Sequence, residues 1–371
     1  MSSILFFEQL LNGIQFGTML FLMSAGLTLI FGVMGLINLA HGSFYMIGAF
    51  SAALIAGLTG SFWLALLASL SGAAIAGVLI ETLIIRRLYR RDHLDQVLAT
   101  FALILLLSEG VRWCFGAFPL YLDIPENLNG TLPILDDIIY SKYRLFIIFM
   151  GLLIATGLYI LITKTRLGVR IRAGQNDRQM ISALGIDISK LYTIVFALGA
   201  SLAGLAGAMI GAIQSVEVGM GEPILILAFV VIVIGGIGSI KGALIGSILV
   251  GVTDTIGRIF LPEFLKIFME PASATSVGSS IGSMLIYILM ALILIIIACS
   301  CQKIEEYYPQ ITTNFFNKGI PIERVTQQIE SDLTCIDKNC AEIEVNYPIF
   351  KSNELLNECV LVIKNIESNK K

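Results

Sequence analysis

The chain consists of long apolar stretches separated by short polar connections. From Gln9 to Ile80 it contains no Asp, Glu, Lys or Arg, and His41 is the one side chain in that run that ionises near neutral pH. A helix needs about 20 apolar residues to cross the hydrocarbon core of a bilayer, so this run predicts three membrane spans, and the later apolar stretches predict six more. We therefore expect spans near residues 10–34, 37–58, 62–85, 96–116, 145–163, 191–213, 223–237, 242–260 and 280–300.

Some of these segments have the composition of interrupted helices. Residues 223–237 and 242–260 are short and joined by the glycine-rich connection 235–242, and residues 33–42 carry polar side chains flanked by glycines. Broken or re-entrant helices are tolerated at membrane depth only where protein or water surrounds their backbone. The expected fold class is all-α: a polytopic integral membrane protein with about nine transmembrane helices, within a range of eight to ten.

The charged connections predict the orientation. Residues 86–91 and 164–178 are rich in Arg and Lys, whereas residues 117–143 between them contain several acidic side chains. Positively charged loops stay on the cytoplasmic side, so we expect the two basic connections inside and 117–143 outside. Two spans separate the basic connections, as this orientation requires. This orientation places the N-terminus outside and the C-terminus in the cytoplasm. We expect the protein to lie in the bacterial inner membrane.

Residue spacing within the spans also predicts local contacts. Small residues recur every four positions on one helix face, which favours close helix packing in lipid. Acidic and basic residues near the span ends, at helical spacing, favour local ion pairs. The small residues are Gly199, Ala203, Gly207 and Gly211, and the expected pairs are Glu81–Arg86, Glu109–Arg112 and Asp254–Arg258.

Composition excludes most other classes of protein. The chain is 56% hydrophobic and 14% charged, with a mean hydropathy of +0.86, whereas soluble domains carry about 25% charged residues. The net charge of −3 gives no reason to expect nucleic acid as a partner. The phosphate-binding, zinc-protease and serine-hydrolase motifs are missing, and the chain has two histidines. We expect no catalytic residues, no metal site and no cofactor.

The last part of the chain differs from the rest. Residues 301–371 contain eight Lys and Arg against eleven Asp and Glu, and their composition is typical of disordered segments. We expect a transmembrane domain over 1–300 and a cytosolic tail over 301–371. The tail is interpreted either as a lineage-specific extension or as the product of a frame change near residue 298.

Polar residues inside the first apolar run are candidates for a substrate pathway. Asn38, His41 and Gly42 lie between glycines that permit a helix break. A break exposes backbone groups and helix ends that can bind the charged ends of a zwitterion. The alternative is that Asn38 and His41 only satisfy backbone groups at a helix turn, and the sequence leaves both open.

The basic connection over 164–190 is a candidate contact with a cytosolic partner. Residues 177–184 have helix-forming composition, and Gly185 is placed to end that helix. A short helix at the inner face that leads into a span suits the transmission of motion. The alternative is an ordinary basic loop that only sets the orientation.

Four motifs in order give the chain a family resemblance. They are GLTLIFGVMGLINLAHGSFYMIG at 26–48, DHLDQVLATF at 92–101, RAGQNDRQMISALGI at 172–186 and GGIGSIKGALIG at 235–246. Together they resemble the H-type permease of branched-chain amino acid ABC importers over residues 8–298. The chain departs from that family after residue 297, where the long tail replaces the short, arginine-containing C-terminus that family members usually have.

The resemblance implies a division of labour among subunits. The expected partners are two ATP-binding subunits, a second, homologous permease subunit, a periplasmic solute-binding protein and membrane lipid. The segment that would dock on the ATP-binding subunits includes Arg172, Asn176, Arg178, Ser182 and Gly185. Related permeases serve urea and short amides, which keeps that substrate class open. The remaining alternatives are a stand-alone ion-coupled transporter and a membrane scaffold without transport.

Overall fold

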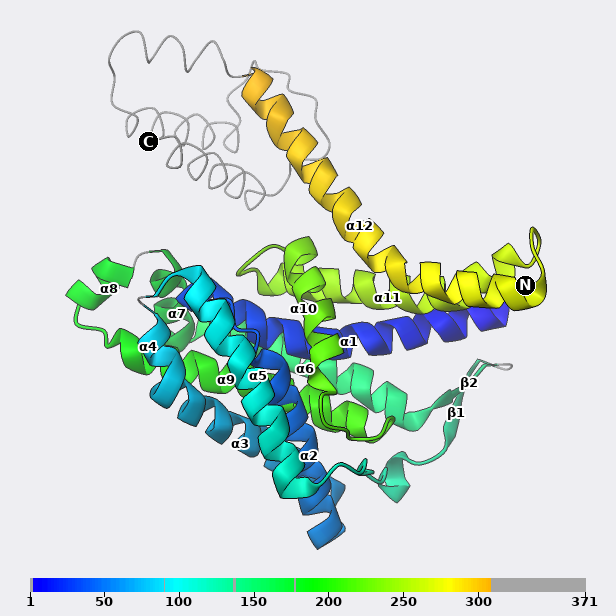
Figure 1. Ribbon diagram of the computed structural model, residues 1–371, viewed down its shortest axis with the longest axis horizontal. Helices are drawn as coiled ribbons and strands as arrows, with labels where there is room; N and C mark the ends of the chain where they lie inside the picture. Colours follow the sequence, from blue (N-terminus) through cyan, green and yellow to red (C-terminus); the bar gives the residue numbers. More distant parts are fainter. Residues whose placement is uncertain (1–2, 90, 136–137, 177, 308–371) are drawn as a thin grey trace. The chain divides into compact units, whose positions relative to one another are not determined.

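All nine apolar stretches fold as helices. The structure is a computed structural model and describes residues 3–89, 91–135, 138–176 and 178–307 (Figure 1). Five short helical elements and a β-hairpin connect these helices within the described residues. The helices that carry the apolar stretches are α1 (Ser3–Met34), α2 (His41–Thr59), α3 (Phe62–Ile80), α5 (His93–Phe115), α6 (Lys142–Lys164), α9 (Ile188–Gly211), α10 (Gly221–Gly235), α11 (Ile240–Leu265) and α12 (Pro271–Tyr307). The connecting elements are the π-helical turn η1 (Glu81–Ile85), α4 (Arg86–Leu88), the 3₁₀ turn η2 (Glu126–Leu128), β1 (Thr131–Leu135), β2 (Ile138–Ser141), α7 (Arg166–Asn176) and α8 (Arg178–Ala183).

Within the described residues, eight helices are long and apolar enough to cross a membrane, and α10 is apolar but has only 15 residues. The predicted membrane fold is therefore confirmed. The break predicted within 33–42 is present, since α1 ends at Met34 and α2 begins at His41. Gly35 makes this turn with a φ of +60°, a region that glycine enters without steric cost. The segments 223–237 and 242–260 were also expected to be interrupted. The first is the short helix α10, whereas the second lies in α11, which runs without a break for 26 residues.

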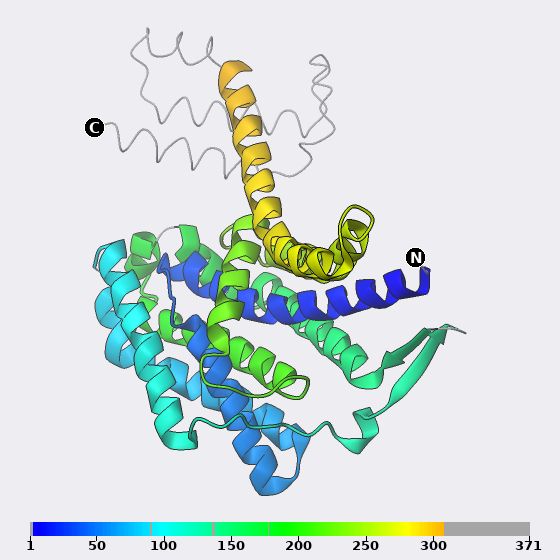
Figure 2. The same ribbon diagram turned by 45° about the vertical axis from the view of Figure 1, so that its right-hand side comes forward.

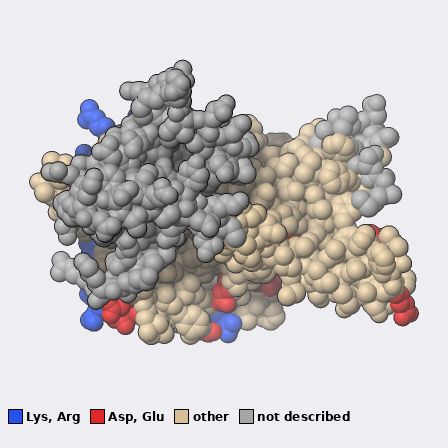
Figure 3. All heavy atoms as spheres, turned by 90° about the horizontal axis from the view of Figure 1, so that it is seen from above, with Lys and Arg blue, Asp and Glu red and all other residues tan. Residues whose placement is uncertain are grey.

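The connections gather at two opposite ends of the helices. The elements α4, α7 and α8 lie together at one end, while the antiparallel hairpin β1–β2 lies at the other (Figures 1 and 2). Figure 3 shows most of the visible Lys and Arg atoms at the left-hand edge, which is the side of α4, α7 and α8 in Figure 1. We call these the basic end and the hairpin end. The prediction that both basic connections share one side is confirmed, and its cytoplasmic location stays a prediction.

Closely packed helices form the core around α1 and α9. A β-carbon built on Gly26 of α1 would lie 2.5 Å from the carbonyl oxygen of Gly199 in α9, and one built on Gly48 of α2 would lie 2.2 Å from the Cα of Gly204. Gly207 meets the backbone of Tyr45 in the same way. The predicted close packing along α9 is confirmed, and larger side chains at these crossings would push the helices apart.

The three predicted ion pairs are present. Their N–O distances are 2.9 Å for Glu81–Arg86, 3.0 Å for Glu109–Arg112 and 2.9 Å for Asp254–Arg258. Glu109–Arg112 is exposed, whereas the carboxylates of Glu81 and Asp254 are buried. Each of these two buried carboxylates is therefore paired with its own arginine, which follows four or five residues later in the chain.

The chain divides into two units, residues 1–290 and 291–371. Within the second unit, the described residues are those at the end of α12, which continues past residue 300 to Tyr307. The tail predicted over 301–371 lies mostly outside the described residues, so its nature stays a prediction.

Candidate functional site

The break between α1 and α2 brings buried polar groups into the interior of the bundle. Asn38 and His41 are both fully buried. Asn38 Oδ1 accepts a hydrogen bond from the Ala40 N–H at 3.1 Å, and its backbone oxygen accepts from the His41 N–H at 3.3 Å. One half of the Asn38 amide therefore supports the turn. Its Nδ2 has no hydrogen-bond partner among the described residues.

His41 does not have this supporting role. Its ring faces the backbone of Met23 in α1 and packs edge-on against Phe44, with ring centroids 6.1 Å apart. Neither ring nitrogen makes a hydrogen bond of normal geometry to a described residue, and the same holds for the hydroxyl of Ser43 in the first turn of α2. Buried polar groups usually have a partner, so this cluster of unsatisfied donors and acceptors is unusual for a site with only a structural role.

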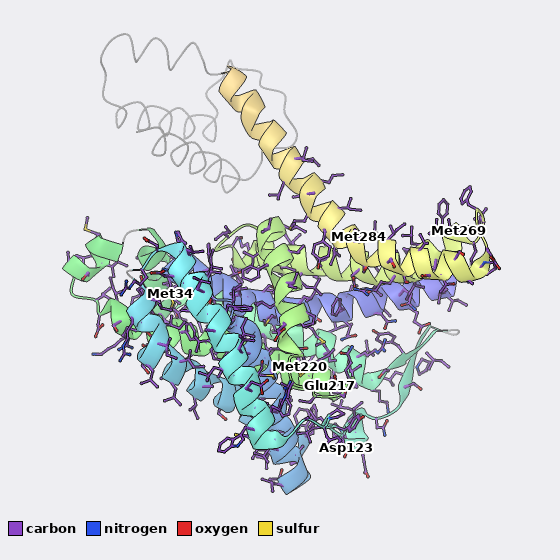
Figure 4. The ribbon with its side chains drawn as sticks, in the orientation of Figure 1. Met34, Asp123, Glu217, Met220, Met269 and Met284 are labelled. Atoms are coloured by element: carbon purple, nitrogen blue, oxygen red, sulfur yellow. The ribbon has the colours of Figure 1, made fainter. Side chains whose placement is uncertain are left out.

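The first turn of α2 packs against the first turn of α10. A β-carbon built on Gly42 would lie 2.6 Å from the Gly221 carbonyl oxygen, and one built on Gly221 would lie 1.9 Å from the Gly42 carbonyl oxygen. Met220, labelled beside Glu217 in Figure 4, ends the loop that leads into α10. Two helix N-termini, each carrying a partial positive charge, therefore meet beside His41. Such a pair of termini favours a negatively charged group between them.

At the basic end, the segment 164–190 folds as two short helices, α7 and α8, before α9 begins. The helix predicted over 177–184 is present as α8, and Gly185 follows it with a φ of +81°. Gly185 and Ile186 close the turn with N–H groups that donate to the carbonyl oxygens of Ser182 and Ile181. The predicted stop at Gly185 is confirmed. The helix α7, which precedes it, was not predicted.

The candidate coupling residues whose side chains the structure describes lie on different elements. Arg172 is exposed but donates to the Ile162 carbonyl oxygen at the end of α6, so it also stabilises the turn between α6 and α7. Ser182 is exposed on α8. The side chains of Asn176 and Arg178 lie outside the described residues.

Sequence reasoning missed how Glu81 connects two helices at this end. Its carboxylate accepts hydrogen bonds from Arg86 Nη2 at 2.9 Å, the Tyr89 hydroxyl at 2.7 Å and the Thr193 hydroxyl of α9 at 2.8 Å. Burial, followed by the hydrogen bond to Glu81, raises the pKa of the Tyr89 hydroxyl above its usual value. The buried carboxylate lies in the π-turn η1, and π-turns inside α-helices are frequent at functional sites.

Comparison with known proteins identifies the family. The model of the family described as the permease component of the branched-chain amino acid transport system matches residues 9–298. The chain belongs to this family. It is therefore a multi-pass membrane protein and a permease component of a transport system, and the resemblance given by the four motifs is confirmed.

Individual relatives agree with the family match. The permease is 32% identical over 266 residues to the high-affinity branched-chain amino acid transport system permease protein BraD of Pseudomonas aeruginosa, covering 68% of this chain and 86% of BraD. It is 29% identical over 283 residues to LivH of Escherichia coli, covering 70% of this chain and 89% of LivH. It is 27% identical to LivM of Salmonella typhimurium over 271 residues, covering 66% of this chain and 62% of LivM.

Proposed function

We propose that this permease is the channel-forming subunit of an ATP-driven importer of branched-chain amino acids in the bacterial inner membrane. The observation that carries the proposal is the family match over residues 9–298, together with relatives whose names describe high-affinity branched-chain amino acid transport. ATP hydrolysis is supplied by two separate subunits. A periplasmic binding protein delivers the solute, and a second permease completes the path.

The pathway runs past Asn38, His41 and Gly42. A branched-chain amino acid carries a carboxylate, and the paired N-termini of α2 and α10 favour such a group beside the unsatisfied nitrogens of His41. An aliphatic side chain suits the apolar surroundings of the same point, where Phe44 and Leu225 are buried. Recognition of a charged end with an apolar side chain fits an amino acid better than urea.

The ATP-binding subunits dock on α7 and α8 at the basic end. In addition to exposed Arg172 and Ser182, this segment exposes 59% of Met180 and 73% of Leu184. These apolar side chains lie outside the candidate spans, where exposed hydrophobic residues beside charged ones are typical of protein interfaces. Arg178, Asn176 and the Gly185 stop complete the proposed docking segment.

An ion-coupled mechanism has less support. Such transporters use buried carboxylates to bind protons or cations. The two acidic side chains that are buried among the described residues, Glu81 and Asp254, each pair with an arginine. Their charges are already neutralised by a partner that belongs to the same chain.

Reconstitution tests this function. Vesicles that contain the permease, its partner permease and the ATP-binding subunits should import leucine only with ATP inside and binding protein outside. Arg178→Glu and Leu184→Asp should lower uptake at least fivefold with unchanged membrane insertion. Lys142→Glu, at the start of α6 directly after β2, should have little effect and serves as the charge-reversal control. Normal uptake by both docking variants would refute the docking segment, and leucine uptake driven by an ion gradient alone would refute the ATP-driven mechanism.

A further inference from the structure

Gln175 of α7 lies where three separate parts of the permease meet. A β-carbon built on Gly32 of α1 would lie 2.6 Å from Gln175 Nε2 and 3.0 Å from the Cα of Gly238 in the turn between α10 and α11. One built on Gly238 would lie 3.8 Å from the same Nε2 atom. The end of α1, the helix α7 and the α10–α11 turn therefore touch at one point. Gly32 is needed for this approach, because a β-carbon there would collide with the glutamine amide, whereas one on Gly238 would only be in ordinary contact with it.

The helix α7 lies directly against α1 and α9, with its inner side buried. Ile171 is 1% exposed. A β-carbon built on Gly174 would lie 3.4 Å from Leu191 Cδ2 in α9 and 3.8 Å from Val33 Cγ1 in α1. Close-packed interiors transmit strain because they have little free volume. A movement of α7 must therefore move Gln175 against its neighbours.

The α10–α11 turn is equally tight. Gly236 and Gly238 both have a φ of +85°, and a β-carbon built on Gly242 would lie 1.6 Å from the carbonyl oxygen of Gly235. The turn therefore holds the end of α10 directly against the start of α11. A displacement of the turn is passed to α10 as a whole.

The opposite end of α10 lies at the proposed substrate pathway. Gly221 packs against Gly42, next to His41. At a rise of 1.5 Å per residue, the 15 residues of α10 separate its two ends by roughly 22 Å. One short helix thus connects the point contacted by Gln175 with the buried polar groups at the start of α2.

We propose that Gln175 is a positioning residue through which α7 and α8 act on α10 and, through α10, on the substrate pathway. The inference rests on the proposed function, because it gives the docking segment a physical connection to the pathway. Gln175 does not touch the solute. Its removal should leave docking and ATP hydrolysis in place and weaken the link between hydrolysis and import.

The test uses the complete reconstituted importer and measures the number of ATP molecules hydrolysed per leucine imported. Gln175→Ala removes the contact, and Gly32→Ala displaces the glutamine. Each should raise the ratio at least fivefold with normal membrane abundance and complex assembly. The double variant should match the single variants, because both substitutions break the same contact. Gln214→Ala at an exposed site in the 212–220 loop and Gly157→Ala, where a β-carbon meets no atom within 4 Å, are the matched controls.

Several results would overturn the inference. An unchanged ratio in Gln175→Ala would do so, as would a fall in uptake that only follows a fall in abundance. If Gln175→Ala fails to insert, Gln175→Asn decides, since it keeps the amide and shortens the side chain by one methylene. An unchanged ratio in that variant also counts against the role. Failure of the wild-type complex to import leucine with ATP would instead refute the proposed function, on which this inference depends.

Discussion

Replacing Arg86 by methionine should destabilise the permease more than replacing its partner, Glu81, by glutamine. The Glu81 side chain is fully buried, while that of Arg86 is 41% exposed. Without the guanidinium, the carboxylate keeps only the neutral hydroxyl donors of Tyr89 and Thr193. Removing one partner of a buried ion pair costs about 3–5 kcal/mol, because the other charge is left without compensation.

Glu81→Gln should cost less. The arginine left behind can turn toward water, so the loss is that of the hydrogen bonds at a buried site, about 1–3 kcal/mol. The double variant Glu81→Gln, Arg86→Met contains neither charge. It should therefore be more stable than Arg86→Met alone, by roughly 0.5–3 kcal/mol, which is a typical interaction energy between residues in contact.

Unfolding by sodium dodecyl sulfate in mixed micelles, followed by circular dichroism, measures these free energies. Arg87→Met is the control: this neighbouring side chain is exposed, and surface substitutions usually stay within about 0.5 kcal/mol. A double variant less stable than Arg86→Met would refute the reasoning, because it would mean that the buried carboxylate needs no cation.

Three further predictions concern His41, Gly42 and Tyr89. His41→Leu removes two buried ring nitrogens that make no hydrogen bond of normal geometry to a described residue, so we expect unchanged or higher abundance with at least fivefold lower leucine uptake; equal loss of both would indicate a structural role. In contrast, Gly42→Ala places a methyl group against the Gly221 backbone and should lower abundance itself. Tyr89 has a raised pKa, so it keeps its proton above pH 10 in the folded state but loses it when unfolded. The free energy of unfolding should therefore fall above pH 10, by up to about 1.4 kcal/mol per pH unit, and Tyr89→Phe should reduce that slope.

Features determined by neighbouring residues could be predicted from the sequence. Apolar length predicted the helices, and spacing within one turn predicted the ion pair of Asp254 with Arg258. The helix break before His41 and the stop at Gly185 were predicted because glycine marks positions that other residues tolerate poorly.

Features that depend on distant residues could not be predicted. Thr193 reaches Glu81 across a sequence separation of 112 residues, and no local pattern indicates such a contact. The meeting of Gly42 with Gly221, and of Gly32 with Gln175, likewise depends on how the helices cross. The hairpin β1–β2 was missed because its strands are only five and four residues long and lie within a loop.

The shortness of α10 has a consequence for the bilayer in which the permease works. A helix of roughly 22 Å falls about 8 Å short of a 30 Å hydrocarbon core. Non-helical chain over 212–220 must cover that depth, where it pairs with the opposite loop through the bridge between Leu120 and Val216. Lipids with longer acyl chains would draw hydrocarbon over this loop at a cost for every ångström of mismatch. Transport should therefore depend on acyl-chain length, and the dependence should originate at this thinnest part of the protein.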